Sequence, residues 1–540
     1  MKRKHFKVLS LVLALVLTFN LVACNTDDGT EDPDTPPAVG GEEDPDDTGD
    51  DTGDDTETGE PLAFTLMSSI WGAHEVSTRD DGSNIVLDQM QKDTNTDITF
   101  QWHPADQYAN VVTTTLASGP IPEVINGAGG LLIDEGAAIE LDDLLAEHGS
   151  NILESFQDLP IEETKLRSVE DGKLYQIPFI LDYPPAYAWS IRTDWLDQVN
   201  LDMPETWDDW MEVWGAFKSD VDNDGNLVLP YSGDVYSLMP IFGMNVSNRY
   251  TMMIDENNQW TLAPEHENFR TYLEAVREMY ELGYLDPEFV DRGVYVNNNS
   301  LQDAVNAGLT GSTFTWAEIT RTATLALQEV NPDAKLEGIT PPVGPNGDSG
   351  IPARSAVTPT SVITIAAQER GIEADLVKFF DYVFSPEGVI TMSYGVEGET
   401  YDLVDGVPVL RDTVGTSFID AREAGLNFTP LAHRFAPEAY ESLTLGGLTY
   451  EEADPAVKQF ADALTIAEGH WFSSAPILNT EAYTEYGAEL MPQLGTAIAQ
   501  TITGDISIDE FYEQYENLKA AGLQDILEQG AANWSALTGQ

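Results

Sequence analysis

The chain has little cysteine and few basic residues, and both shortages exclude classes of function. Cys24 is the only cysteine among 540 residues, so the protein cannot form an internal disulfide. Lys and Arg number 25 against 93 Asp and Glu, which gives a formal net charge of −68. Binding to nucleic-acid phosphates requires basic patches, so nucleic acid is not an expected partner. The same imbalance argues against anionic ligands, unless a local basic pocket exists.

Several motifs of common catalytic centres are missing as well. The chain has no G-x-S-x-G elbow and no H-E-x-x-H zinc motif, and its seven histidines are scattered without metal-ligand spacing. Gly127–Gly130 lacks the G-x-G-x-x-G spacing of a dinucleotide-binding loop, so we interpret it as a tight turn. A glycoside hydrolase needs two carboxylates facing each other across a cleft, and among 93 acidic residues such a pair arises easily by chance. A secreted carbohydrate-active hydrolase therefore stays open as an alternative.

The N-terminus has the features of a lipoprotein export signal. Its basic n-region contains Lys2, Arg3, Lys4 and Lys7. Val8–Phe19 is an apolar h-region that is too short to span a bilayer. Leu21–Cys24 resembles a lipobox, and in that kind of signal the peptide is cut before the cysteine, whose thiol is then lipidated. We expect residues 1–23 to be a signal peptide and Cys24 to anchor the protein to the cell membrane, facing outside.

The segment after Cys24 is strongly acidic. Residues 25–60 contain 16 Asp and Glu, no Lys, Arg or aromatic residue, and a short TGDDTGDDTETGE repeat. Such a segment cannot bury enough apolar surface to offset its ordering entropy, and its like charges extend it. We therefore interpret residues 24–60 as a disordered tether rather than as a calcium-collecting tail.

The remainder of the chain, residues 61–540, is long enough for two large lobes. Removing the 16 acids of the tether and the four bases of the n-region leaves a charge near −56 for this body. Dense surface carboxylates keep a protein soluble, so we hypothesise a saline or alkaline habitat. Unfolding measured against salt concentration tests this hypothesis, and a body that is most stable without salt would refute it.

The start of the body alternates between strand and helix patterns. Expected strands are Leu62–Ile70, Asp97–Trp102 and Pro122–Asn126, and expected helices are Ser83–Lys92 and Tyr108–Ser118. This βαβ pattern predicts a parallel sheet with helices on both faces. Ligands of such sheets bind at the carboxyl ends of strands, which places Trp71, His74, Trp102 and the Asn126–Gly127 loop at a candidate binding edge.

A later acidic segment matches half of a calcium-binding loop. In the EF-hand numbering it supplies oxygens at positions 1, 3 and 5, glycine at 6 and a backbone carbonyl at 7: Asp220, Asp222, Asp224, Gly225 and Asn226. Position 12, where a bidentate Glu belongs, is Tyr231, so one strong ligand must come from elsewhere, with Asp234 the nearest candidate. A structural calcium ion and a plain acidic turn both stay open.

The stretch Gly172–Trp210 connects two expected cores. An apolar, aromatic-rich run is broken by Pro178, Pro184 and Pro185, and a helix pattern follows it. Proline fixes φ and removes a hydrogen-bond donor, so this crossing lies outside a central sheet position. We predict a strand that leaves one core, passes a proline-stiffened hinge and enters the other.

The motifs of this stretch resemble a known family. They are G-K-x-Y-x-I-P from Gly172, I-R-x-D-W-L from Ile191, P-x-T-W-D-[DE]-W from Pro204, and the later segments Ser385–Gly388, Tyr394–Gly398 and Glu481–Trp534. Taken in this order, they resemble extracellular solute-binding protein family 1. The resemblance is closest to the sugar-binding lipoproteins of ABC importers, in their LipO-like branch, and it spans about residues 61–540.

The resemblance implies an α/β fold of two lobes, of the periplasmic-binding-protein type II. It implies lobes built on parallel sheets, a central ligand cleft and a helical C-terminal region. We expect lobe 1 at about residues 61–178 plus 345–390, and lobe 2 at about 185–340 plus 395–540. The family implies a monomeric binder rather than an enzyme, with ABC permease subunits as partners and no required cofactor. A surface adhesin lipoprotein is a further alternative, although the chain lacks the internal repeats that usually build one.

The implied ligand is a carbohydrate, most simply an oligosaccharide. Sugars present hydroxyls and flat apolar faces, so their sites combine stacking aromatics with planar polar groups. The chain has 11 Trp and 20 Tyr, and each of them is as well suited to a core as to a cleft. The aromatic candidates are Trp71, Tyr183, Tyr187, Trp189, Trp316 and Tyr394, and the polar candidates are His74, Asn126 and Glu318. Ligand contacts to both lobes would stabilise a closed state by population shift.

Overall fold

The structure is a computed structural model. It describes residues 59–70, 84–157, 159, 166–168, 171–181, 187–246, 251–292, 299–353, 356–411, 414, 425–426, 431–436, 438–439, 444–445, 450–472, 475–478 and 480–539. Two larger sheets organise these residues, one with six strands and one with four. We call the six-stranded sheet with its helices lobe 1, and the four-stranded sheet with its helices lobe 2.

The sheet of lobe 1 has the strand order β15-β4-β12-β3-β1-β2. Its strands are β1 Leu62–Ile70, β2 Thr96–Pro104, β3 Val124–Asn126, β4 Ile177–Leu181, β12 Val357–Ile363 and β15 Arg434–Phe435. β1 pairs in parallel with β2 and β3, as the βαβ pattern predicts. β12 pairs antiparallel with β3 and β4, so the sheet is mixed and β12 is the strand by which the chain returns to lobe 1.

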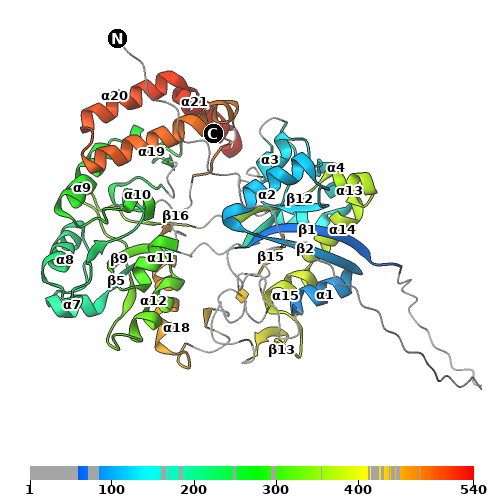
Figure 1. Cartoon of the computed structure of the whole chain (residues 1–540), viewed down its shortest axis with the longest axis horizontal. Helices are drawn as coiled ribbons and strands as arrows, with labels where there is room; N and C mark the ends of the chain where they lie inside the picture. The colour runs from blue at the N-terminus through cyan, green and yellow to red at the C-terminus, as the bar shows by residue number, and fades with distance from the viewer. Residues whose placement is uncertain are drawn as a thin grey trace, which may run out of the picture. The chain divides into compact units, whose positions relative to one another are not determined.

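Helices cover both faces of this sheet because its central strands are apolar on both sides. Leu66 and Val124 belong to one hydrophobic cluster, and the residues that follow them, Met67 and Ile125, belong to another, as the alternation of a strand requires. The helices are α1 Ile85–Thr94, α14 Glu373–Val383 and α15 Pro386–Tyr394 in the first cluster, and α2 Ala105–Ser118 and α3 Gly129–Asp134 in the second. Figure 1 shows α2 and α3 on one side of β1 and β2, and α1 and α15 on the other.

Lobe 1 extends further along the chain than the sequence pattern predicts. The hairpin of β13 Tyr401–Val404 and β14 Val407–Leu410 buries Tyr401 and Leu410 in the same cluster as α15, and β15 pairs with β4. The expected return to lobe 2 at residue 395 is therefore too early. The remaining helices of lobe 1 are α4 Asp142–His148, α5 Ser150–Gln157 and α13 Ile365–Arg370.

The sheet of lobe 2 has the strand order β10-β5-β9-β6. Its strands are β5 Tyr187–Arg192, β6 Leu229–Tyr231, β9 Thr310–Trp316 and β10 Leu336–Ile339. β5 pairs antiparallel with both β9 and β10, and β6 pairs in parallel with β9. This sheet therefore has one side, across the strand ends, where the carboxyl ends of β6 and β9 lie beside the start of β5. We call this side the lobe-2 edge.

The core of lobe 2 is rich in aromatic side chains. Helix α8 Trp207–Asp220 begins at Thr206, which forms a capping box with Asp209. It buries Trp207, Trp210, Trp214 and Phe217, whose spacing of three and four residues puts them on one face of the helix. The same cluster contains residues of η2 Val235–Phe242, α9 Phe269–Leu282, α19 Ala488–Thr503, α20 Ile508–Leu518 and α21 Gln524–Thr538.

Two further helices, α12 Glu318–Gln328 and α18 Pro455–Glu468, pack against each other and against β10. The close approach of α18 requires Gly338 of β10, because a Cβ there would lie 2.6 Å from the Cβ of Ala463. Helix α18 thus packs on the sheet of lobe 2, while its Phe460, Ala463 and Leu464 also belong to the hydrophobic cluster of lobe 1. The remaining elements are α7 Thr193–Val199, α10 Phe289–Arg292, α11 Asn299–Asn306, β7 Met252–Ile254, β8 Trp260–Leu262, η3 Ala263–Glu265, β11 Ile351–Pro352, β16 Trp471–Phe472, η5 Tyr483–Gly487 and η6 Lys519–Leu523.

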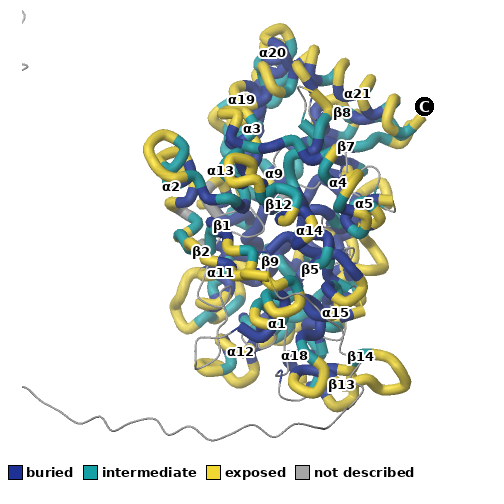
Figure 2. The backbone as a smooth tube through the Cα atoms, turned by 90° about the vertical axis from the view of Figure 1, so that its right-hand side faces the viewer, coloured by how far each residue is buried: buried dark blue, intermediate teal, exposed yellow. Residues whose placement is uncertain are grey.

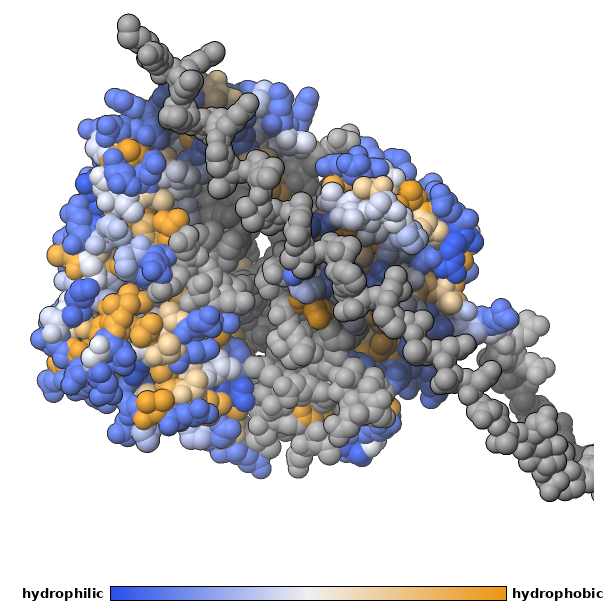
Figure 3. All heavy atoms as spheres, in the orientation of Figure 1, coloured by the Kyte–Doolittle hydropathy of each residue, from blue (hydrophilic) through white to orange (hydrophobic). Residues whose placement is uncertain are grey.

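Burial follows the sheets, and the surface is mainly polar. Figure 2 shows buried residues along the strands and exposed residues on the outer turns of helices such as α2, α12 and α20. Figure 3 shows hydrophilic residues over most of the visible described surface, interrupted by small hydrophobic patches. No helix among the described residues has the length and apolarity needed to cross a membrane.

Candidate functional site

The lobe-2 edge carries a pair of aromatic side chains. Tyr187 at the start of β5 is the register partner of Trp316 at the end of β9. Their ring centroids lie 4.7 Å apart at an interplanar angle of 46°. Both side chains are only partly buried, and Trp316 packs against the small cluster that includes Leu301 and Ile319. We call Tyr187 and Trp316 the aromatic platform.

A charged pair follows the platform directly in the chain. Glu318 opens helix α12, and its Oε1 accepts a hydrogen bond from Nη1 of Arg321 at 2.9 Å. The two side chains are 20% and 13% exposed, so they are largely shielded from solvent. A carboxylate and a guanidinium next to partly exposed rings are the planar polar groups that fix the hydroxyls of a sugar.

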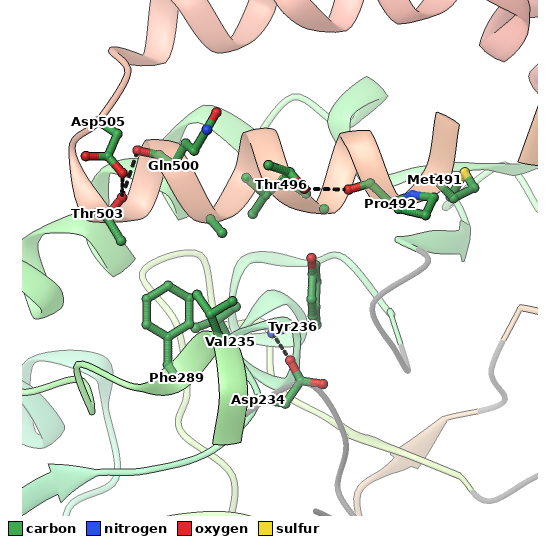
Figure 4. Close-up of a pocket in the computed structure, with 14 residues that line it drawn as sticks. Asp234, Val235, Tyr236, Phe289, Met491, Pro492, Thr496, Gln500, Thr503 and Asp505 are labelled. Atoms are coloured by element: carbon green, nitrogen blue, oxygen red, sulfur yellow. Dashed lines mark hydrogen bonds between the residues drawn. The ribbon is translucent and has the colours of Figure 1, made fainter. Parts of the chain in front are cut away.

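The other end of the lobe-2 edge contains a cavity. β6 ends at Tyr231, and the chain then passes Gly233 and Asp234 to enter η2. The Oδ1 atom of Asp234 accepts the backbone N–H of Tyr236 at 2.9 Å and so caps this 3-10 helix. A cavity of about 480 Å³ lies between this turn, α10 and α19 (Figure 4). Its walls include Asp234, Val235, Tyr236, Phe289, Val290, Met491, Pro492, Gly495, Thr496, Ile498, Ala499, Gln500, Thr503 and Asp505.

In lobe 1, Asn126 lies at the carboxyl end of β3. This residue is 5% exposed, and its Oδ1 accepts the hydroxyl of Ser361 at 2.7 Å. Its backbone oxygen accepts the hydroxyl of Tyr108 at 2.6 Å. Burial raises the pKa of Tyr108, so this hydroxyl remains a donor at all ordinary pH values. Asn126 thus links the end of β3 to Ser361 within β12, and a contact between Asn126 and a ligand stays a prediction.

Two of the predicted ligand-binding aromatics lie in cores instead. Trp189 is fully buried on β5, where its ring packs against Trp210, Tyr231 and Phe314 at centroid distances of 5.5–5.7 Å. Tyr394 on α15 is 7% exposed and packs on Tyr401. The expectation that Trp189 faces a cleft is wrong for this structure, because helix α8 covers this part of β5 and its Trp210 packs on the Trp189 ring. Tyr394 likewise belongs to the core of lobe 1.

Several of the predicted functional residues lie outside the described residues. They are Trp71, His74, Tyr183 and the lipidation candidate Cys24, together with the signal peptide and most of the tether. Among the described residues of the predicted set, Tyr187 and Trp316 are cross-strand partners, and Glu318 follows Trp316 as the first residue of α12.

The acidic segment after α8 forms an exposed turn. Asp224 and Gly225 have left-handed backbone, with φ of 54° and 78°, and Asp222 Oδ1 accepts the backbone N–H of Asp224 at 3.1 Å. Tyr231 is fully buried in β6, and Asp234 lies beyond the far end of that strand as the cap of η2, so it is not the missing ligand. Among the described residues, no group of three or more His, Cys, Asp or Glu is placed to hold a metal ion. The side chains of this turn are thus not arranged as a metal site here.

The sequence interpretation missed Arg321 and the cavity. The spacing of Glu318 and Arg321, three residues apart at a helix start, was a usable signal for an ion pair. The cavity had no comparable signal, because its walls come from segments far apart in the chain that the fold brings together, around Tyr236, Phe289 and Gly495.

The comparisons with known proteins identify the class of this chain. Residues 83–390, more than half of the chain, match the family described as bacterial extracellular solute-binding protein. The chain belongs to this family, and its two-lobed α/β architecture is the fold of type II solute-binding proteins.

Particular relatives cover most of the chain. Lipoprotein LipO of Bacillus subtilis (strain 168) is 27% identical over 474 residues, which cover 82% of this chain and 87% of LipO. The structure of the alginate-binding protein AlgQ2 without calcium ion has a TM-score of 0.66 at 22% identity, covering 88% of this chain and 98% of AlgQ2. The structure of FusA, an ABC-transporter substrate-binding protein of S. pneumoniae, in complex with kestose has a TM-score of 0.66 at 18% identity, covering 88% of this chain and 99% of FusA.

Proposed function

We propose that this protein is the substrate-binding component of an ABC importer and that it captures an oligosaccharide by closing its two lobes. The observation that carries the proposal is the aromatic platform of Tyr187 and Trp316, which the Glu318–Arg321 pair follows in the chain. The rings offer flat apolar surface for a sugar face, and the charged pair offers acceptors and donors for its hydroxyls. Carbohydrate ligands of relatives such as FusA support the same class of ligand.

The mechanism follows from linkage between binding and conformation. A ligand that contacts both lobes binds the closed state more tightly than the open state, so it shifts the population toward closure. β4 of lobe 1 and β5 of lobe 2 adjoin the crossing at residues 182–186, where Pro184 and Pro185 limit the backbone. This crossing and the return through β12 are the places where a hinge motion would occur.

The proposal includes attachment to the outer face of the membrane. Cys24 follows a lipobox-like segment, and the acidic tether would hold the body away from the bilayer. LipO, which the chain resembles over most of its length, is itself named a lipoprotein. The importer's permease subunits are the expected protein partners.

We also propose that the Asp220–Asn226 loop binds calcium weakly. Its turn exposes carboxylates at the first positions of a calcium loop, and their side chains would have to move to enclose an ion. The relative AlgQ2 has been described in a calcium-free form, and FusA as an EF-hand mutant, which makes the ion worth testing here.

A screen of glycans by thermal shift tests the proposed function, since a ligand that binds only the folded protein raises its melting temperature. We expect a subset of neutral oligosaccharides to raise it, and expect the recovered sugars to be intact. Release of new reducing ends would instead favour the hydrolase alternative. A Trp316→Ala variant that keeps full affinity for the bound sugar would show that the platform is not the site.

A further inference from the structure

Trp471 of β16 is more exposed than any other tryptophan of the described chain. Its exposed fraction is 41%, whereas the remaining described tryptophans are buried or partly buried. Tryptophan is highly buried on average, because a large ring gains much free energy by leaving water. A ligand with a flat apolar face would cover the exposed part of this ring, and one face of a sugar is such a surface.

Backbone pairing and packing hold the strand of this ring in place. Ala353 N donates to Phe472 O at 2.8 Å, and β16 pairs in parallel with β11. Phe472 packs closely on Gly350, where a Cβ would lie 2.9 Å from the Phe472 ring. Neighbouring side chains of a strand point to opposite sides, so Trp471 lies on the other side of β16 from Phe472. A ligand that stacks on Trp471 would therefore meet a strand that is already ordered, which lowers the entropic cost of binding.

β16 lies where the chain returns from lobe 2 to lobe 1. Its partner β11 packs against β5, the strand that begins with Tyr187 of the platform, and Figure 1 shows β16 close to β5 and β9. After β11 the chain continues to β12 of lobe 1, and on this path Ala356 O accepts Leu181 N of β4 at 2.9 Å. Tyr187 thus follows the first crossing between the lobes, and Trp471 lies beside the second crossing. A ligand held between the lobes would lie near both rings.

We propose that Trp471 binds a second sugar unit of the oligosaccharide, in addition to the unit that stacks on the platform. This assignment rests on the proposed function. Trp471 belongs to the two-stranded sheet of β11 and β16, whereas the platform belongs to the four-stranded sheet, so the two are separate stacking positions. A short oligosaccharide reaches only one of them, and a longer one covers the apolar surface of both. Trp471 would thus make the protein select its ligand by length.

The test uses series of neutral oligosaccharides that differ only in length. Xylo-, malto- and fructo-oligosaccharides of two to six units are titrated calorimetrically into the wild type and into Trp471→Ala. In a series that binds, we expect the affinity of the wild type to rise with length. Trp471→Ala should bind the longest member about tenfold more weakly and the shortest bound member with unchanged Kd. Trp316→Ala should weaken every member that binds, because all of them need the platform.

The dependence on length separates a ligand contact from a structural effect. A substitution that only disturbs the fold of lobe 2 would weaken the binding of every length alike. An equal loss at all lengths in Trp471→Ala, or no loss at any length, would therefore overturn the inference and leave the proposed function intact. A wild type that binds no member of any series would contradict the proposed function as well.

Two further variants check that the effect comes from the ring itself. Trp471→Phe keeps an aromatic ring and should recover most of the affinity for the longest member, and a loss as large as in Trp471→Ala would count against stacking. The matched control is Tyr512→Ala, which removes a partly exposed ring that contacts Arg270 on helix α20. We expect this control to match the wild type at every length, and a loss confined to long members there too would overturn the assignment to Trp471.

Discussion

Trp189 and Trp316 should respond to truncation in opposite ways, although both are tryptophans in paired strands of one sheet. Trp189 is fully buried and packs on three aromatic rings, whereas Trp316 is partly exposed at the lobe-2 edge. Truncating a buried tryptophan removes its transfer free energy and leaves a cavity, at a cost of about 3–5 kcal/mol. We therefore expect Trp189→Ala to lower the free energy of unfolding of the protein by that amount.

Trp316→Ala should affect binding more than folding. Losing a stacking aromatic from a binding site costs about 1–3 kcal/mol of binding free energy, or roughly 5- to 150-fold in Kd. The stability loss should be smaller than for Trp189→Ala, since part of the Trp316 ring is already in contact with solvent.

Two measurements on each variant separate these outcomes. Urea unfolding gives the free energy of unfolding, and calorimetric titration with an oligosaccharide that stabilises the wild type gives Kd. Trp189→Ala should bind that sugar with nearly unchanged Kd at a temperature where it is folded. The reasoning fails if Trp189→Ala unfolds at the wild-type midpoint, or if Trp316→Ala loses stability and keeps its affinity.

Three further predictions concern the anchor, the acidic loop and a buried histidine. Cys24→Ser should move the protein from the detergent phase to the aqueous phase without changing its melting temperature; unchanged partitioning would refute the lipid anchor. The melting temperature should be modestly higher with calcium than with a chelator, and the double variant Asp220→Ala, Asp224→Ala should lack this difference. An equal melting temperature of the wild type in calcium and in chelator would show that the loop is a plain turn. Burial lowers the pKa of His433 to about 4, so between pH 6.5 and 4 the unfolded chain binds a proton that the folded protein does not. Acidification from pH 6.5 to 4 should therefore lower the free energy of unfolding, by up to about 3 kcal/mol from this residue. The free energy of unfolding of His433→Gln, measured with urea, should depend less steeply on pH. Identical pH profiles of the variant and the wild type would contradict the lowered pKa of His433.

Much of the architecture could be predicted from local patterns. Leu62–Ile70 and Phe269–Leu282 have the predicted bounds, because an apolar strand and a helix with one apolar face are set by short-range periodicity. The end of lobe 1 could not be predicted in this way. Arg434–Phe435 is too short to show a period, and it joins lobe 1 only because β4 offers a free edge for pairing.

The site was partly predictable for a similar reason. The resemblance of Thr313–Glu318 to a strand-to-loop segment of the family pointed to Trp316 and Glu318, and the structure has them at the end of β9 and the start of α12. Whether an aromatic faces the core or the edge depends on its partners, and Trp189 is buried by α8, a helix that the strand's own sequence does not reveal. The cavity walls around Gly495 and Tyr236 depend on tertiary packing alone.

The central claim is that this solute-binding protein captures an oligosaccharide without altering it. Calorimetric titration of the purified protein with neutral oligosaccharides, followed by chromatography of the recovered sugar, tests this claim most directly. The account predicts saturable binding of one sugar per protein and recovery of that sugar at its original length. Absence of binding by every oligosaccharide, or recovery of shortened products, would contradict it.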